Sequence, residues 1–223
     1  MDRKKFLVTA GLAAFSISAC ASIKIDGESG KISSAASGGE GETDVEGGLL
    51  GQCATTNDIL GPFYRANAPV RTDLTFTGLE GANVQVKGRI LAEDCITPLE
   101  NALVEIWHCN TEGEYDNDTA DYLHRGLQTT SKTGEYSFNT ILPGKYLNGK
   151  LYRPAHIHFR ITSPTSNELV SQLYFMGDPH ITKDPWASQE KAVDRIRPVV
   201  LEDTKGNLVV NLDVFTTKAA AKK

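Results

Sequence analysis

The chain lacks several features that would each point to a common class of protein. Its 223 residues carry a formal net charge of −5 and no basic stripe, so binding to a nucleic-acid backbone is not expected. No Cys-x-x-Cys motif occurs, and a thiolate zinc site is therefore not supported. No dinucleotide or flavin motif occurs either, so redox chemistry would have to proceed without those organic cofactors. No internal repeat is evident, which favours one folded domain over a repeat array.

The N-terminal residues read as an export signal. Residues 3–5 are basic, residues 6–19 are apolar or small, and this run is too short and wrongly flanked for a spanning helix. Ile17-Ser18-Ala19-Cys20 resembles a bacterial lipobox, which implies cleavage before Cys20 and lipidation of its thiol. Ordinary signal cleavage nearby, with Cys20 as a spare thiol, is the alternative. Residues 2–7 also resemble a twin-arginine signal with one arginine replaced by lysine, so the export route stays open.

Composition divides the rest of the chain into two parts. Residues 20–51 are dominated by Gly, Ser, Ala, Glu and Asp, and such a segment buries too little apolar surface to fold. We therefore predict a lipoprotein-type signal peptide over 1–19, a flexible tether over 20–51 and one catalytic domain over 52–223. The expected location is the periplasmic or cell-surface side of a membrane. The lipid at Cys20 is the only contact with that membrane that we expect.

Three of the four cysteines remain once Cys20 is assigned to lipidation. A disulfide between Cys53 and Cys95 is expected in an oxidising compartment, where it would pin the start of the domain to the end of a strand. Cys109 is then unpaired, and we interpret it as a small buried apolar residue.

The folded part is rich in short strands separated by Gly, Pro, Asn and Asp. The pattern predicts an all-β, single-domain β-sandwich whose active site is built from strand ends and loops. A helix is expected over Trp186–Ile196. The predicted strands are Asn83–Leu91, Ala102–Asn110, Glu135–Thr140, Ala155–Thr162, Leu169–Met176 and Leu208–Phe215.

His156 and His158 lie one residue apart in a run that reads as a strand. Residues i and i+2 of a strand share a face, so these imidazoles project together while Ile157 and Phe159 project to the other side. Paired imidazoles suit zinc, copper, iron and nickel. The alternative is a pair of half-buried histidines that only form hydrogen bonds.

Two tyrosines extend the possible site. Tyr115 follows a strand and Tyr146 lies in a turn before the histidine strand; each would also fit a structural role at a strand end. Phenolate is a hard anionic donor that favours ferric iron, and two tyrosinates with two histidines would leave the ion a net charge of +1. Tyr122 is the rival to Tyr115 on spacing. Arg153 would add a fixed cation beside the site.

Taken together, five segments of the sequence resemble the intradiol ring-cleaving dioxygenases, the family of catechol 1,2-dioxygenase and protocatechuate 3,4-dioxygenase. The resemblance covers about Gln52 to Phe215, and the segments occur in family order. They are Gly61-Pro62-Phe63-Tyr64, Val104–Asn110 with Gly113-Glu114-Tyr115, Gly134–Thr140 with Pro143–Tyr146, Arg153–Phe159, and Gln172–Pro179.

The resemblance implies an iron(III) enzyme that uses O2 to cleave a catechol between its hydroxyl-bearing carbons, giving a cis,cis-muconate-type product. It implies that the residues have three kinds of role. The implied iron ligands are Tyr115, Tyr146, His156 and His158; the catalytic residues are Arg153, Tyr146 and Gln172; the pocket residues are Trp107 and Tyr64.

Two departures limit what the resemblance implies. The segment from Tyr146 to Arg153 is short compared with the catechol enzymes, and a signal and tether stand where those enzymes have a helical dimerisation segment. The identity of the catechol and the oligomeric state are therefore not transferred. The layout is most similar to the small exported members of the family.

The other histidines have simpler interpretations, and two other functions predict different features. We interpret His108 as a hydrogen-bonded residue behind the site and His180 as part of a surface turn. His124 and Arg125 lie in a loop near the expected pocket; we interpret this loop as solvated, and the alternative is that these two residues contact the substrate. A lipid-anchored sandwich that binds a carbohydrate or a protein would hold no iron and would not need these tyrosines and histidines to converge. A cupin-type metalloenzyme would place a carboxylate and another histidine beside the His-x-His pair.

Overall fold

The computed structural model describes residues 53–202 and 207–219. The expected signal peptide, the lipidation site Cys20 and the expected tether lie outside the described residues. In the part that is described, no helix has both the length and the apolar character that crossing a membrane requires.

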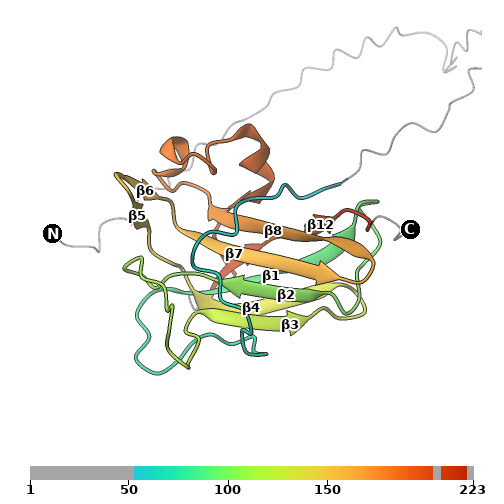
Figure 1. Ribbon diagram of the computed structural model, residues 1–223, viewed down its shortest axis with the longest axis horizontal. Coiled ribbons are helices and arrows are strands. Elements are labelled where there is room, and N and C mark those ends of the chain that lie inside the picture. The colour runs from blue at the N-terminus through green and yellow to red at the C-terminus, as the bar shows by residue number, and fades with distance from the viewer. Residues whose placement is uncertain (1–52, 203–206, 220–223) are drawn as a thin grey trace, which may run out of the picture. The chain divides into compact units, whose positions relative to one another are not determined.

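Two five-stranded sheets and a hairpin make up the fold (Figure 1). The first sheet contains β10 (Val200–Leu201), β11 (Leu208–Asn211), β1 (Asn83–Ala92), β12 (Val214–Thr216) and β4 (Glu135–Ile141). In it, β4 pairs antiparallel with β1, while β11 and β12 run parallel to β1. The second contains, in spatial order, β3 (Arg125–Thr129), β2 (Leu103–Trp107), β7 (His156–Ser163), β8 (Ser166–Phe175) and β9 (Ile196–Arg197). The hairpin is β5 (Tyr146–Asn148) with β6 (Leu151–Arg153), and two short 3-10 helices follow β8, namely η2 (Ile181–Lys183) and η3 (Glu190–Arg195).

The hydrophobic core lies between the two sheets. Val84 and Val86 of β1, Ile106 of β2, and Phe159 of β7 belong to one cluster of buried side chains. Strands with one face in such a cluster present their other face to loops or solvent. The predicted all-β sandwich of one domain is therefore confirmed for the described residues.

The histidine strand behaves as its alternation predicts. Ile157, Phe159 and Ile161 of β7 are buried in the core between the sheets. His156 and His158 therefore lie on the opposite, outer face of the second sheet, and both are only 1% exposed. Their burial on that outer face requires a cover, which the connecting segments provide.

The predicted strand over Leu208–Phe215 is divided into β11 and β12. The carbonyl oxygen of Leu212 lies 1.9 Å from the position that a Cβ atom on Gly88 would occupy. Asp213 then accepts hydrogen bonds from the backbone N–H and the guanidinium of Arg89, at 2.9 and 2.8 Å. The chain is thus interrupted where it passes β1, and the prediction of one continuous strand is wrong.

The predicted helix over Trp186–Ile196 is also wrong in type and extent. Only Glu190–Arg195 is helical, and it is a 3-10 helix. The carboxylate of Asp184 accepts the backbone N–H groups of Trp186 (3.0 Å) and Ala187 (2.7 Å). These contacts join Asp184 to residues only two and three positions along the chain, and such local bonds from a side chain to the backbone compete with the first turn of a regular helix.

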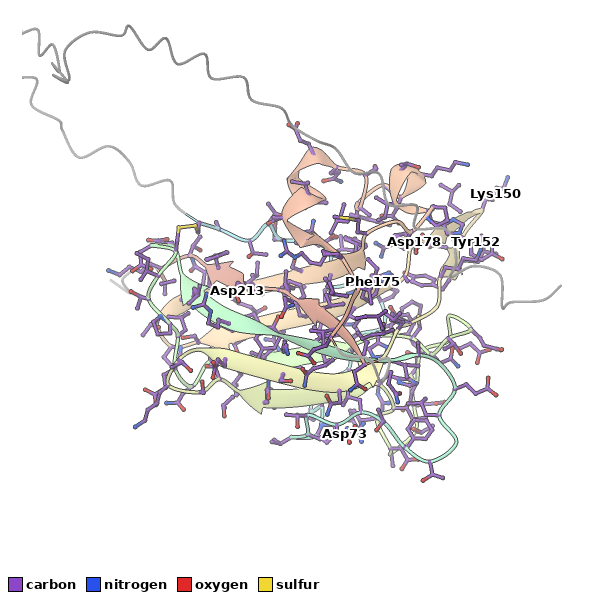
Figure 2. All side chains as sticks on the ribbon, turned by 180° about the vertical axis from the view of Figure 1, so that it is seen from behind. Asp73, Lys150, Tyr152, Phe175, Asp178 and Asp213 are labelled. Atoms are coloured by element: carbon purple, nitrogen blue, oxygen red, sulfur yellow. A yellow bond between two sulfur atoms is a disulfide. The ribbon has the colours of Figure 1, made fainter. Side chains whose placement is uncertain are left out.

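Strand β3 and the β5–β6 hairpin were missed from the sequence. Strand β3 contains Gly126 and begins directly after His124, whose φ of 57° lies in the left-handed region. Its pairing with β2 makes it a strand despite these weak local signals. Figure 2 shows Lys150 and Tyr152 of the hairpin at the opposite side of the view from the disulfide.

Candidate metal centre

The outer face of the second sheet carries a row of chemically active side chains. Cross-strand register places Trp107 opposite His158, and the two rings stack with centroids 4.8 Å apart. His156, two residues before His158, lies opposite Tyr174 of β8. Residues in register on adjacent strands share a face. The row across β3, β2, β7 and β8 therefore reads Arg125, Trp107, His158, Gln172.

Two loops bring Tyr115 and Tyr146 over this face. Asn110, just after β2, joins them: its carbonyl accepts the N–H of Gly144 at 2.9 Å, and its side-chain oxygen accepts the N–H of Glu114 at 2.9 Å. Asn and Asp side chains commonly stabilise turns through such bonds to nearby backbone N–H groups. The residues that precede each tyrosine are thus fixed to the same anchor.

Two glycines allow the loops to touch backbone to backbone. A Cβ atom on Gly144 would lie 2.1 Å from the carbonyl oxygen of Thr111. Gly113 has a φ of +89°, and a Cβ atom there would lie 2.4 Å from the carbonyl oxygen of Lys145. Any other residue would push the loops apart. The short distance between Tyr115 and Tyr146 therefore depends on these glycines.

The four predicted ligands converge. Tyr115 contacts Tyr146 and His158, with ring centroids 5.8 and 6.2 Å apart. His156 contacts Tyr146 and His158, with centroids 5.6 and 4.9 Å apart. The hydroxyl of Tyr115 lies 3.4 Å from Nε2 of His156. Two phenols and two imidazoles, from two loops and one strand, thus enclose one small region of the outer face.

Both histidines present a metal-binding nitrogen. Nδ1 of His156 lies 2.7 Å from the carbonyl oxygen of Pro154, so Nδ1 carries the proton and Nε2 faces Tyr115 as an acceptor. Burial, together with the charge of Arg153, lowers the pKa of His156 to about 4. Burial also holds the pKa of His158 well below its usual value. Both rings are therefore neutral at pH 7, the form that binds metals.

His158 gives the clearest sign that a ligand belongs here. Neither of its ring nitrogens has a hydrogen-bond partner, although both are buried. An unsatisfied buried polar group costs free energy unless something binds it. A metal ion held by His158, His156 and the two phenols would satisfy one of these two nitrogens, so the residues present fit a metal.

The phenol of Tyr115 is neutral without such an ion. Burial raises its pKa well above the ordinary value, although Arg153 and Arg125 act in the opposite direction. A bound cation reverses this preference, because it stabilises the deprotonated ligand. The surroundings of Tyr115 therefore couple ionisation of its phenol to metal binding.

Arg153 lies at the end of the hairpin and is 2% exposed. Its Nε donates to Asp184 at 2.8 Å, and its Nη2 donates to Gln172 at 3.0 Å. The ring of Trp186 covers the guanidinium, with Cζ 4.4 Å from the ring centroid. Burial opposes the charge, but hydrogen bonds to Asp184 and Tyr146 hold the pKa of Arg153 above its usual value. The structure thus places Arg153 and Gln172 in direct contact, beside Tyr146.

Trp107 and Tyr64 lie on the other side of His158. The ring of Tyr64 meets that of Trp107 edge-on, with centroids 5.1 Å apart. The hydroxyl of Tyr64 accepts a hydrogen bond from Arg160 at 2.8 Å and donates to Glu105 at 3.3 Å. The hydroxyl of Tyr64 is therefore committed to this ion pair, and its ring supports the tryptophan.

Phe63 is a site residue that sequence reasoning missed. Its ring stacks on Tyr115 with centroids 4.2 Å apart, and it meets Tyr146 edge-on at 5.7 Å. Its neighbour Tyr64 was selected from the same four-residue segment. The phenyl ring of Phe63 has no atom that binds a metal or forms a hydrogen bond, so residue type did not mark it as a site residue. Its place in the segment Gly61-Pro62-Phe63-Tyr64 was the one signal that could have identified it.

The other histidines fall in different places. His108 is fully buried and its Nε2 bonds to Thr140 at 2.7 Å, so the prediction that it is a hydrogen-bonded residue is confirmed. His124 and Arg125 are 3% and 1% exposed, so their assignment to a solvated loop is wrong. Arg125 belongs to β3, which pairs with β2, and the ring of His124 contacts those of Phe76 and His108, with centroids 6.0 and 5.0 Å apart. These contacts join residues distant in the sequence, so the local sequence did not indicate them. The hydroxyl of Tyr122 donates to the carbonyl of Ala66, on a different contact from the four converging rings.

No group of three or more His, Cys, Asp and Glu side chains is arranged to hold a metal ion within residues 53–202 and 207–219. A cupin-type site would need such a group. The four-ring cluster differs from such a group, because half of its possible donors are the tyrosines Tyr115 and Tyr146.

The cysteines lie as follows. A disulfide joins Cys53 and Cys95, with Cα atoms 5.2 Å apart. Cys109 is unpaired and buried, and burial raises the pKa of its thiol to about 12. A thiol with so high a pKa is a poor nucleophile and metal ligand at neutral pH.

Comparisons with known proteins give one answer. A family model described as Dioxygenase matches residues 59–220. A catechol 1,2-dioxygenase of Acinetobacter lwoffii is 33% identical over 180 residues, which cover 71% of this chain and 62% of the relative. The β chain of protocatechuate 3,4-dioxygenase of Burkholderia cepacia is 36% identical over 160 residues, covering 62% of this chain and 68% of the relative.

Solved structures agree with these relatives. The dioxygenase domain of a carbohydrate-binding fusion from Streptomyces sp. SirexAA-E superposes with a TM-score of 0.65 at 28% identity, over 75% of this chain and 100% of that one. Catechol 1,2-dioxygenase of Acinetobacter sp. ADP1 gives 0.65 at 26% identity, over 75% and 64%. The chain therefore belongs to the intradiol ring-cleavage dioxygenase family.

Proposed function

We propose that this protein is a non-heme iron(III) dioxygenase that cleaves a catechol between its two hydroxyl-bearing carbons with O2. The expected product is a cis,cis-muconate-type diacid. The observation that carries the proposal is the convergence of Tyr115, Tyr146, His156 and His158, with both ring nitrogens of His158 buried and unpartnered. Relatives named for catechol and protocatechuate dioxygenases support the same substrate class.

The donor set supports ferric iron as the metal. Tyr115 and Tyr146 supply two hard anionic oxygens, and His156 and His158 supply two neutral nitrogens, so a trivalent ion would keep one positive charge. Ferric iron held there would supply a Lewis acid that binds both oxygens of a catechol and withdraws electrons from its ring. No organic cofactor is needed for this chemistry.

The tyrosines would divide the work. Tyr115 is fixed between Phe63 and His156, and it would hold the metal throughout. Tyr146 is half-buried and is the first residue of a short hairpin, so it has room to turn outward. We assign to its phenolic oxygen the acceptance of one proton from the incoming catechol.

Arg153 would stabilise negative charge that develops on the substrate as oxygen adds. Its guanidinium is permanently charged, buried and held by Asp184 and Gln172, so little reorganisation is required. Trp107, stacked on His158 and supported by Tyr64, would form the flat apolar wall against which an aromatic ring lies.

The test is a visible absorption spectrum of the purified protein after loading with iron(III), before and after adding catechol without oxygen. A red-brown tyrosinate-to-iron band that moves to longer wavelength with catechol is expected. The zinc-loaded protein is the matched control and stays colourless. A colourless iron-loaded protein would instead favour a binding module, while iron bound without a tyrosinate band would favour a cupin-like centre.

Export and anchoring form a separate part of the proposal. The basic residues 3–5, the apolar run 6–19 and Cys20 support cleavage before Cys20 and attachment of lipid there. The protein would then act outside the cytoplasm. Metabolic labelling with a radioactive fatty acid should mark the wild-type chain but not Cys20→Ala, and equal labelling of both would contradict the anchor.

A further inference from the structure

Arg125 is a buried cation that the proposed chemistry does not use. It is 1% exposed and begins β3 on the outer face of the second sheet. In the described part of the chain, no carboxylate lies within salt-bridge distance of it; the nearby Asp116 pairs with Arg65 instead, at 3.5 Å. Burying a charge without a counter-charge is costly, so its contacts call for an explanation.

The guanidinium of Arg125 binds main-chain carbonyls from two separate segments. Nε and Nη2 both donate to the carbonyl of Asp116, at 3.1 and 2.7 Å. Nη1 donates to the carbonyl of Phe63, at 2.8 Å. The planar fork of arginine makes several such bonds at fixed angles, which a lysine ammonium does not reproduce.

Both carbonyls belong to the immediate surroundings of Tyr115. Asp116 is the next residue along the chain, so its carbonyl fixes the backbone on one side of the tyrosine. The ring of Phe63 stacks on the ring of Tyr115 at a centroid distance of 4.2 Å and an interplanar angle of 14°. One side chain therefore restrains Tyr115 through its backbone and through the ring that lies on it.

We propose that Arg125 is a positioning residue that fixes Tyr115 in the geometry needed to bind the metal. Arg125 lies on a paired strand, opposite Trp107, which in turn stacks on His158. The rigid sheet that carries the histidines thus also sets the position of a ligand that comes from a loop. This inference rests on the proposed function, because it assigns Arg125 a role at the same metal centre.

Arg71 offers a matched control. It also reaches the connection between Tyr115 and β3, where its Nε donates to the carbonyl of Arg125 at 2.9 Å and its Nη2 donates to the carbonyls of Asp121 and Tyr122. None of these carbonyls adjoins Tyr115. A substitution of Arg71 therefore loosens the same connection without releasing the two restraints on the tyrosine.

The experiment compares the full-length wild type with Arg125→Lys, Arg125→Met and Arg71→Lys, each loaded with iron(III). Three quantities are measured: the tyrosinate-to-iron absorption band, the iron retained against a competing chelator, and the melting temperature. Both Arg125 variants should shift or weaken the band and retain iron about tenfold less tightly, as expected for a group that orients a metal ligand. Arg71→Lys should lower the melting temperature and leave the band in place.

The outcomes separate this inference from the proposed function. A wild type without a tyrosinate band would refute the iron site itself, and with it the role of Arg125. A normal wild-type band that is unchanged in both Arg125 variants, or changed equally in Arg71→Lys, would overturn only the positioning role. If neither Arg125 variant folds, Phe63→Leu removes the stacked ring but keeps Arg125; it should change the band in the same direction, and an unchanged band overturns the proposal.

Discussion

At the scale of single residues, the two tyrosines of the site differ in how firmly they are held. Tyr115 is stacked by Phe63, and its neighbours are bound by Arg125. Tyr146 starts the β5–β6 hairpin, where the next residue, Leu147, is 56% exposed. If both tyrosines bind the metal as proposed, Tyr115 is suited to be the fixed ligand and Tyr146 the movable one.

Replacing Tyr146 with phenylalanine tests that difference. Tyr146→Phe removes the phenolic oxygen that we assign as proton acceptor, so turnover of catechol should fall by about 10²-fold or more. Iron should remain bound through the other three ligands, with part of the tyrosinate band retained. Tyr152→Phe, in the same hairpin, removes an exposed hydroxyl and is the control in a steady-state oxygen-uptake assay. Full turnover by Tyr146→Phe would show that the assigned proton transfer is wrong.

Asp184 and Arg153 form an ion pair in which both side chains are at least 98% buried, with exposures of 1% and 2%. Although burial alone would raise the pKa of Asp184, hydrogen bonds from Arg153 and from the N–H groups of Ala187 and Trp186 hold it below its usual value. Asp184→Asn should lower the free energy of unfolding by about 3 kcal/mol, because it leaves a buried guanidinium without its counter-charge.

Urea unfolding of the metal-free protein measures this cost. Asp213→Asn is the control, since Asp213 pairs with Arg89 at 2.8 Å but is 37% exposed, and such surface pairs contribute about 1 kcal/mol or less. Equal effects of the two substitutions would mean that the buried pair contributes no more than the exposed one.

At the scale of secondary structure, local pattern was sufficient where a strand carries its own alternation. In β7 the apolar residues Ile157, Phe159 and Ile161 define one face, so the strand and the orientation of its histidines were predictable. Strand β3 contains Arg125, Gly126 and Gln128, and it exists because β2 pairs with it. An element whose stability comes from a partner distant in sequence leaves little signal in its own residues.

Gly144 joins two elements at a point where no side chain fits. Gly144→Ala would place Cβ 2.1 Å from the carbonyl oxygen of Thr111, so the loops carrying Tyr115 and Tyr146 must separate. We expect a loss of about 2 kcal/mol or more in stability, together with weaker iron retention. Gly149→Ala is the control: its φ of +64° strains alanine, but nothing lies within 4 Å of the added atom. Iron retention equal to wild type in Gly144→Ala would show that the loop contact does not position the tyrosines.

At the scale of the whole molecule, the four proposed ligands were more predictable than the residues that support them. Tyr115, Tyr146, His156 and His158 were identified from motif order, and the structure brings them together. Supporting residues such as Arg125 and Phe63 act through backbone carbonyls and ring faces. Those contacts depend on the three-dimensional path of the chain, so residue type alone does not identify them.

The burial of several neutral histidines makes the stability of the metal-free protein depend on pH. Burial lowers the pKa of His108 to about 3 and that of His156 to about 4, while the pKa of His158 is also strongly lowered. Below the unfolded value of about 6.5, the unfolded chain binds protons that the folded protein does not, so stability falls as the pH falls. The decline should level off only below the folded pKa values.

Between about pH 6.5 and about pH 5, each such histidine should cost about 2 kcal/mol of unfolding free energy. Urea titrations at several pH values measure the decline, and calorimetry in buffers of different ionisation enthalpy counts the protons taken up on unfolding. Uptake of more than one proton near pH 5 is expected from His108, His156 and His158 together. Unfolding without proton uptake would mean that these rings are solvated or already charged in the folded protein. That result would contradict the burial of neutral His156 and His158 on the outer face of β7.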